Sequence, residues 1–292
     1  MAKLKEQLIE KSLVLSASFT ILTTVAIIGI LLYESVQFFK EVSFFDFLTD
    51  TQWTPLFTEK HFGILPLLSG TILTSFVALF IAVPMGLSIA IYLNEYATRR
   101  FRRAIKPLLE LLAAVPSVVY GFFALIIVTP ILQYFFPSIS GFNSLSAGIV
   151  MAIMILPFIS SLSEDALFAV PKELREASYA MGATRFQTVF KVTLPAANSG
   201  IIVSIILAVS RAVGETMIVA IAAGQQPRLS FDPTVPIETI SAYIVQVSMG
   251  DVPHDSIEYR TIFAAGITLF LLTFILNNLS YNLRKKYQKK YE

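Results

Sequence analysis

The apolar residues of this chain gather into long runs that polar segments separate. Six runs of about 20 residues are each long enough to cross roughly 30 Å of hydrocarbon as a helix. They cover residues 13–38, 65–93, 107–133, 144–163, 199–224 and 261–282. Because runs of this length exceed those of ordinary buried helices, we predict an all-α membrane protein with six transmembrane helices. The whole chain, residues 1–292, then forms a single integral membrane domain.

The first run predicts a retained membrane anchor. Its apolar stretch from Leu13 to Tyr33 is longer than the roughly 7–15 apolar residues of a signal peptide. No alanine occurs between Ala26 and Ala78, so the small-residue cleavage site of a signal peptide does not follow it. We therefore expect this segment to stay in the protein as its first span.

Lysine and arginine are distributed unevenly between the segments that connect the spans. If the N-terminus is cytoplasmic, the inner segments hold 17 of these residues, Lys289 and Lys290 among them, and the outer segments hold 4. The excess of positive charge on one side predicts an N-in, C-in orientation. One further basic residue, Arg211, lies inside the fifth span. The outer basic residues are Lys40, Lys60, Arg228 and Arg260.

Composition excludes an ordinary soluble enzyme. The chain is 55% apolar and only 14% charged, whereas about a quarter of the residues of soluble domains are charged. There is no cysteine and there are two histidines, which excludes disulfide scaffolds, thiolate metal sites and iron–sulfur clusters. We expect no metal site.

Two outer segments are long enough to carry structure of their own. Residues 40–62 hold an aromatic cluster around Phe47 and Trp53, which predicts a segment that lies at the lipid headgroup level. Residues 225–260 form the longest outer loop, and their apolar side chains recur at helical spacing from Ile237 to Val247. This pattern predicts a short amphipathic helix, which either caps the bundle or also contributes to a docking surface for an external partner.

Prolines and small residues lie inside several spans. Pro84, Pro116, Pro130 and Pro157 bend helices where they remove a backbone hydrogen bond. Small residues permit the close helix packing seen in membranes, and a gated pathway needs the same bent and closely packed helices. The small residues are Gly70, Gly86, Ala113, Ala114, Gly121, Ala147, Gly148 and Ala152.

The inner segment at residues 164–198 is too long and too patterned for a bare connection. Pro171 suits the first position of a short helix, and Gly182 can end that helix in a left-handed conformation. Thr184 and Gln187 form a capping-box pattern that starts a second helix before the fifth span. Four acidic and four basic residues exclude the pair from the bilayer, so we expect it at the cytoplasmic surface.

This segment resembles a motif of a known family. The run Glu176–Ala177–Ser178, then Gly182, then Val192–Thr193–Leu194–Pro195 matches the spacing of the EAA motif of ABC importer permeases, E-A-A-x3-G-x9-I-x-L-P, with Ser178 and Val192 as its two departures. The resemblance implies a type I ABC importer permease in which the segment docks on a separate ATP-hydrolysing subunit. The coupling residues it implies are Glu176, Ala177, Gly182, Leu194 and Pro195. A solvated surface helix pair is the alternative.

The fifth span contains two charged residues. Arg211 and Glu215 are four positions apart, so they share one face of a continuous helix and are able to form an ion pair. A central arginine costs roughly 2.5–3.5 kcal/mol on insertion scales, so both residues should face the protein interior or water. We predict that they act in substrate translocation. The alternative is that they neutralise each other and lock the bundle.

The residues around this pair resemble phosphate importer permeases, most of all the PstC-type subunit. The similar segments are Ser210–Met217, Pro116–Gly121 and Tyr243–Ser248. The resemblance implies a multi-pass protein of the prokaryotic plasma (inner) membrane that moves inorganic phosphate inward by alternating access. It also implies three protein partners, namely a PstA-type permease, a dimer of ATP-binding subunits and an external phosphate-binding protein. The family pair linked with phosphate passage falls on Arg211 and Glu215.

Other functions are less well supported by the residues. The chain has no G-x-x-x-x-G-K-[ST] loop, so we expect no ATP hydrolysis and no cofactor in this chain, with ATP used by the partner subunit. The basic clusters at 99–106 and 284–290 flank spans, which accounts for them by topology and lipid contact rather than by nucleic acid. Two alternatives stay open. One is an ABC permease for sulfate, molybdate or an organic solute, and the other is an ion-coupled secondary transporter with Arg211 and Glu215 as a proton relay.

Overall fold

The computed structural model describes residues 2–288, so Lys289 and Lys290 lie outside the described residues. Six helical segments are long and apolar enough to cross a membrane, and the described residues contain no strand. The prediction of an all-α protein with six spans is therefore confirmed. The six segments are Ile9–Glu41, Leu65–Tyr96, Ser117–Phe135, Ser144–Phe168, Arg185–Val213 and Ile257–Leu279.

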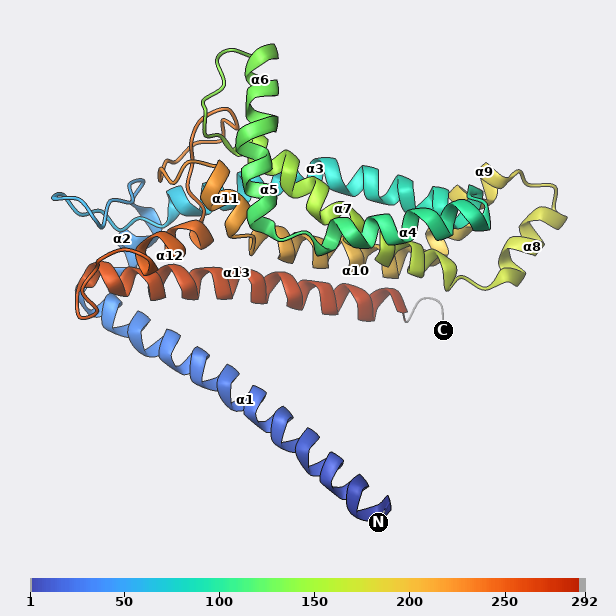
Figure 1. Ribbon diagram of the computed structural model, residues 1–292, viewed down its shortest axis with the longest axis horizontal. Coiled ribbons are helices and arrows are strands. Elements are labelled where there is room, and N and C mark those ends of the chain that lie inside the picture. Colours follow the sequence, from blue (N-terminus) through green and yellow to red (C-terminus); the bar gives the residue numbers. More distant parts are fainter. Residues whose placement is uncertain (1, 289–292) are drawn as a thin grey trace.

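Long helices run along the molecule, except that the first one diverges obliquely from the others, and shorter helices join them (Figure 1). The long ones are α1 (Ala2–Glu41), α3 (Leu65–Ile91), α7 (Ser144–Phe168), α10 (Leu194–Val213) and α13 (Ile257–Gln288). The shorter ones are α2 (Phe44–Thr49), α4 (Arg99–Ala114), α5 (Ser117–Phe123), α6 (Thr129–Phe135), α8 (Lys172–Ala180), α9 (Arg185–Thr188), α11 (Met217–Ala222) and α12 (Ile240–Ser248). Three π-helical turns extend some of them, at η1 (Tyr92–Tyr96), η2 (Ala124–Val128) and η3 (Val189–Thr193).

The centre of the bundle is the contact between α3 and α7. A Cβ atom added at Gly148 would lie 2.5 Å from Val77 Cγ1, and one added at Gly86 would lie 2.8 Å from Ile159 Cγ2. The two helices thus approach more closely than larger side chains allow. The predicted role of Gly86 and Gly148 in close helix packing is confirmed. Ala113 and Ala114 differ, because their helix, α4, has no buried residue.

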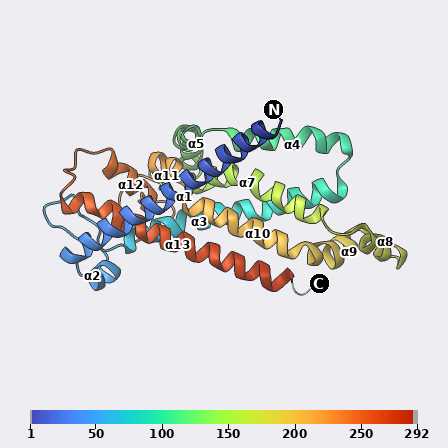
Figure 2. The ribbon, with the colours of Figure 1, turned by 90° about the horizontal axis from the view of Figure 1, so that it is seen from below.

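The third span is shorter than predicted and is not part of the parallel bundle. The sequence predicts it over 107–133, but α4 ends at Ala114 and the span covers Ser117–Phe135. The break lies at Val115, whose ψ of 129° is extended, because a residue that precedes proline is disfavoured in the helical region. Figures 1 and 2 show that α4 lies along the bundle, whereas α5 and α6 turn away from it.

The fifth span is also interrupted. The sequence predicts one run over 199–224, but the helix that starts at Arg185 ends at Val213, and α11 begins only at Met217. Gly214, with φ −88° and ψ 0°, caps α10. Glycine has the largest conformational entropy to lose in a helix, which favours a break at this position.

The outer segment 40–62 is not a simple interfacial segment. Phe47 is 2% exposed and Trp53 is 1% exposed, and both belong to a core cluster with residues of α12 and α13. These two side chains therefore pack inside the protein rather than against lipid headgroups, and the position of the segment at the headgroup level stays a prediction. Trp53 packs edge-on against Tyr243 with 5.0 Å between the ring centroids. Phe44 and Phe45 of α2 are exposed.

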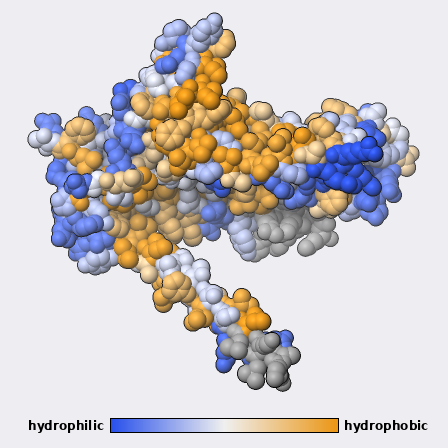
Figure 3. Space-filling model, viewed as in Figure 1, coloured by the Kyte–Doolittle hydropathy of each residue, from blue (hydrophilic) through white to orange (hydrophobic). Residues whose placement is uncertain are grey.

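The bundle has two different ends. The α8 end carries α8 and α9, and α1 begins and α13 ends toward it (Figure 1). The α12 end carries α2, α12 and the loop between α11 and α12. Figure 3 shows hydrophobic surface over the middle of the molecule and more hydrophilic surface toward both ends. Because positive charge favours the inner side, the α8 end is the cytoplasmic end in the predicted orientation.

Candidate translocation site and coupling segment

Arg211 lies in the last turn of α10, beside a cavity of about 240 Å³. Its side chain is exposed to this cavity, and no ion pair is found for it within residues 2–288. A charge inside a span is stabilised by water or by a ligand, so an open cavity is the environment that Arg211 requires. The polar residues that line the cavity with it are Lys106, Glu110, Ser161 and Glu164.

Glu215 does not share a helix face with Arg211. It lies beyond the end of α10, where its Oε1 accepts a weak hydrogen bond from Ile218 N at 3.4 Å. Its backbone oxygen accepts a hydrogen bond from Ser241 Oγ at 2.6 Å, which joins it to α12. The prediction of a pair on one helix face is therefore wrong, because Gly214 ends the helix between the two residues. Their role in translocation stays a prediction.

A buried acidic residue that sequence reasoning did not single out closes the cavity toward the α8 end. Glu164 of α7 is 1% exposed, and its carboxylate contacts Arg102 Nε at 2.5 Å and Lys106 Nζ at 2.9 Å. Both basic residues come from α4, so these ion pairs attach α4 to α7. From the sequence, Arg102 and Lys106 were accounted for by topology and lipid contact. An acidic residue at the end of an apolar run was the available signal.

The coupling segment, residues 164–198, contains the predicted helix–glycine–helix arrangement. Gly182 has φ +80° and follows α8 as a left-handed residue, and Thr184 and Gln187 form the capping box of α9. Both of these predictions are confirmed. Pro171 precedes α8 as its N-cap, with ψ 137°, so the prediction that it occupies the first helical position is wrong. Extended backbone at Pro171 lets the chain turn out of α7 before α8 starts.

The coupling segment exposes several large apolar side chains at the α8 end. Glu176 and Ala177 are exposed on α8, and Pro195 is exposed where α10 begins, next to the half-buried Leu194. A surface that combines several large apolar groups is typical of a protein–protein contact. The exposed apolar residues are Leu174, Tyr179, Met181, Phe186 and Phe190.

Arg175 connects the coupling segment to two spans, and sequence reasoning missed it. Its Nη1 lies 3.0 Å from Glu95 Oε1, and its Nη2 donates to the backbone oxygen of Leu167 at 2.6 Å. Glu95 belongs to η1, which extends α3, and its side chain is 6% exposed. One side chain of α8 therefore links this helix to the ends of α3 and α7. Its position beside Glu176 in the motif was the only sequence signal.

Comparison with known proteins identifies a matching family and several relatives of this chain. The family model described as "Binding-protein-dependent transport system inner membrane component" matches residues 82–289. The phosphate transport system permease protein PstC of Mesorhizobium japonicum is 39% identical, covering 80% of this chain and 76% of that protein. PstC of Pasteurella multocida is 33% identical, covering 94% and 90%. The probable ABC transporter permease protein YqgH of Bacillus subtilis is 36% identical, covering 89% and 84%.

Solved structures share the fold at low sequence identity. A chain of a bacterial alginate ABC transporter in complex with its alginate-bound periplasmic protein has a TM-score of 0.60 at 18% identity. The match covers 91% of this chain and 93% of that chain. A chain of the inward-facing MetNI methionine ABC transporter has a TM-score of 0.56 at 18% identity, covering 77% and 94%. At these identities the likeness concerns the fold alone.

Proposed function

The chain belongs to the family of binding-protein-dependent transport system inner membrane components, and we propose that it is the permease subunit of an ATP-dependent importer of inorganic phosphate. Relatives named PstC at 33% and 39% identity over most of the chain support phosphate as the cargo. Six apolar spans make it a multi-pass protein of the plasma membrane. Phosphate moves inward by alternating access, and a separate subunit hydrolyses ATP.

The observation that carries the proposal is Arg211, which forms no ion pair within the described part of the chain and lies beside the cavity between α4, α7 and α10. A guanidinium group presents a planar fork of donors, which fits two oxygens of phosphate. Lys106 lines the same cavity but is paired with Glu164 at 2.9 Å, so Arg211 is the lining cation that has no ion pair within the described residues. The break after Val213 frees backbone groups beside this position, which a membrane protein tolerates where they line a wet cavity.

Glu215 contributes to the choice between oxyanions. An ionised carboxylate only accepts hydrogen bonds, so it favours a ligand that still carries a proton. Phosphate near neutral pH carries a proton and sulfate does not. A sulfate ion passing Glu215 would therefore meet a negative charge without a compensating hydrogen bond. The external binding protein adds its own selectivity before this step.

The coupling segment is the contact for the ATP-binding subunits. In the N-in, C-in orientation the exposed apolar residues of α8 and α9 face the cytoplasm, where those subunits lie. Arg175 then transmits their closure to α3 and α7 through Glu95 and the Leu167 carbonyl. A PstA-type permease completes the pathway against the exposed cavity face. ATP is bound by the partner, and this chain supplies no nucleotide site.

The test is uptake of radiolabelled phosphate into proteoliposomes that contain this chain with its permease, ATPase and binding-protein partners. Wild-type uptake should require ATP and resist competition by sulfate. Arg211→Ala should abolish uptake, and Glu215→Gln should lower it and let sulfate compete. Arg228→Ala is the matched control, because Arg228 is also exposed but lies in the loop at the α12 end.

Three outcomes would contradict the proposal. Unchanged uptake by Arg211→Ala would remove Arg211 from the pathway. Uptake driven by a pH gradient without ATP would identify a secondary transporter instead. Transport of another solute, with no phosphate uptake, would leave the permease architecture in place and refute the cargo.

A further inference from the structure

A second cavity lies at the α12 end, away from Arg211, and it is built from three separate segments. Its volume is about 290 Å³, close to the lower end of the range of about 300–1,000 Å³ for ligand pockets. We call it the Glu238 pocket. Its lining residues are Trp53–Phe57 from the first outer segment, Gln225–Pro227 and Glu238 from the loop after α11, and Tyr243 and Gln246 from α12.

Glu238 is, together with Trp53 Nε1, one of two polar groups in this pocket that lack a hydrogen-bond partner within the described residues. Its side chain is 1% exposed, and its Oε1 has no hydrogen-bond partner within the described residues. An unpaired buried carboxyl group is costly, and such groups in folded proteins normally find a partner. Burial raises the pKa of Glu238 to about 8, which shows how strongly the site disfavours an uncompensated negative charge. A cation that entered the pocket would provide the compensation.

The aromatic walls of the pocket suit a cation as well. Trp53 and Tyr243 are almost completely buried and meet edge to face beside Glu238. Aromatic rings attract ammonium and guanidinium groups through their negative faces. A carboxyl group together with two aromatic side chains therefore selects a lysine or arginine side chain over a neutral or anionic group.

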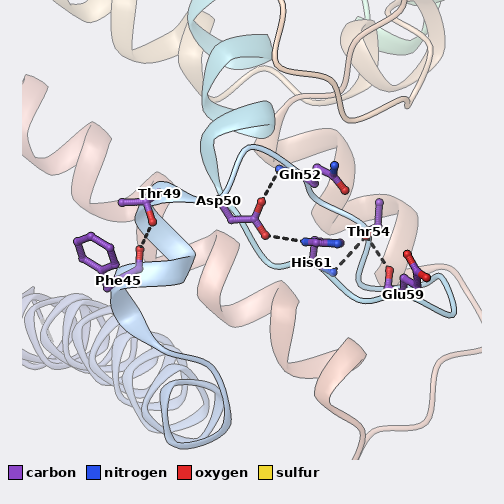
Figure 4. Close-up of polar contacts among 7 residues, drawn as sticks. All are labelled: Phe45, Thr49, Asp50, Gln52, Thr54, Glu59 and His61. Carbon is purple, nitrogen blue, oxygen red and sulfur yellow. Dashed lines mark hydrogen bonds and ion pairs between the residues drawn. The ribbon is translucent and has the colours of Figure 1, made fainter.

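The pocket is held in shape before any ligand arrives. Figure 4 shows that Asp50 contacts His61 Nδ1 and Gln52 N, both at 2.9 Å, and that Thr54 Oγ1 donates to Glu59 O at 2.9 Å. These contacts hold the rim around Trp53. On the opposite wall, Gly224 and Gln225 have positive φ values of 109° and 48°, and Ile237 N donates to Ala223 O at 3.0 Å. A preformed pocket avoids much of the ordering cost of binding.

The charge around the pocket indicates what kind of molecule brings the cation. Apart from the buried Glu238, residues 40–62 and 225–260 contain eight acidic residues and four basic ones. This acidic surface repels free phosphate and is complementary to a partner that contacts it through positive groups. A partner protein with an exposed lysine or arginine complements the charge of both the acidic surface and the Glu238 carboxyl group.

We propose that the Glu238 pocket is the docking site for a lysine or arginine side chain of the external phosphate-binding protein. This proposal rests on the proposed function, because that function and the N-in, C-in orientation place the α12 end outside the cell and define the partner. The inserted side chain pairs with Glu238 between Trp53 and Tyr243. A side chain that docks there contacts α12. Ser241 of α12 donates a hydrogen bond to the backbone oxygen of Glu215, which lies at the break in the fifth span.

The first test uses the pocket's own fluorophore, because Trp53 is the single tryptophan of the chain. The full-length chain in nanodiscs is titrated with N-acetyl-arginine amide or with N-acetyl-citrulline amide, which has nearly the same shape but no charge. The arginine compound should change the emission of Trp53 with saturation, and the citrulline compound should not. Glu238→Gln should remove the response, whereas Glu59→Gln, an exposed rim residue outside the pocket, should keep it. No response of the wild type, or equal responses to both compounds, would overturn the cation pocket.

The second test concerns the partner. The Kd of the phosphate-loaded binding protein is measured for the assembled transporter in nanodiscs with wild-type chain, Glu238→Gln or Glu59→Gln. Glu238→Gln should raise the Kd about tenfold or more, as removal of one member of a desolvated charge pair does. Glu59→Gln removes one charge of the acidic surface and none of the pocket, so it should raise the Kd much less. An unchanged Kd in Glu238→Gln would overturn the docking assignment.

The experiments distinguish failure of the proposed phosphate import from failure of the Glu238 pocket as a docking site. If wild-type proteoliposomes transport another solute, the phosphate function fails, and the docking assignment to a phosphate-binding protein is overturned with it. The fluorescence titration needs neither phosphate nor ATP. A lost response in that titration, with normal phosphate uptake, overturns the pocket alone.

Discussion

The buried Glu238 makes the stability of the protein depend on pH in a direction opposite to that of most acidic residues. Its pKa rises from 4.5 to about 8 in the folded protein because burial removes water from the carboxylate. Between these two values the folded chain keeps a proton that the unfolded chain releases. Stability therefore falls as pH rises from about 4.5 to about 8 and changes no further above that range.

The size of this effect follows from the pKa difference. A difference of about 3.5 pH units, at about 1.4 kcal/mol per unit, corresponds to about 5 kcal/mol of unfolding free energy. Glu238→Gln keeps the shape of the protonated side chain and carries no proton that titrates. Its melting temperature should exceed that of the wild type by an amount that grows with pH, on the order of 10 °C between pH 5 and pH 8.5.

The assay is thermal unfolding of the full-length chain in detergent at a series of pH values. Two other titratable groups lie on the neighbouring helices, Tyr243 on α12 and Glu258 on α13, and both are present in every variant compared. Glu59→Gln controls for loss of an exposed carboxylate at the same end of the molecule. Parallel melting curves for wild type and Glu238→Gln across the pH range would refute the reasoning.

Three further predictions follow from particular contacts. Arg175→Ala should lower the amount of phosphate transported per ATP hydrolysed in proteoliposomes, because it frees Glu95 and the Leu167 carbonyl from the coupling segment. Arg99→Ala should not, because Arg99 is exposed on α4, outside the coupling segment. Gly182→Val should weaken co-purification of the ATP-binding subunits, because a β-branched residue at φ +80° costs roughly 1–2 kcal/mol. Gly182→Asn should be tolerated at this position. Equal co-purification of the two variants would contradict this prediction. Gly148→Ala should lower the melting temperature because the added methyl group meets Val77, at a cost of about 1–3 kcal/mol. Gly29→Ala in α1 should not lower it, because nothing lies near the Cβ position of Gly29. Equal melting temperatures of the two variants would argue against tight packing of α3 on α7.

Much of the coupling segment was predictable from the sequence, and the translocation site was predictable only in part. The cap at Gly182 and the capping box at Thr184 depend on residues within one helical turn, so the sequence specifies them directly. Arg211 was predictable because a charge inside an apolar run is costly and conspicuous. Its separation from Glu215 was not, because Gly214 is compatible both with a continuous membrane helix and with a break, and packing against α12 decides between them.

The sequence by itself determined the number of spans, since the length of an apolar run sets whether a helix can cross the bilayer. Tertiary structure decided which polar groups meet. Glu164 pairs with Arg102 and Lys106, which are about 60 residues away in the sequence. Glu238 and Trp53 line the same pocket at a much larger sequence separation. Trp53 is likewise buried in a cluster that joins its chain neighbours Phe47 and Ile64 to residues of α12 and α13. Local patterns encode helices and caps through nearby residues, whereas burial and charge pairing depend on the arrangement of helices that are distant in sequence.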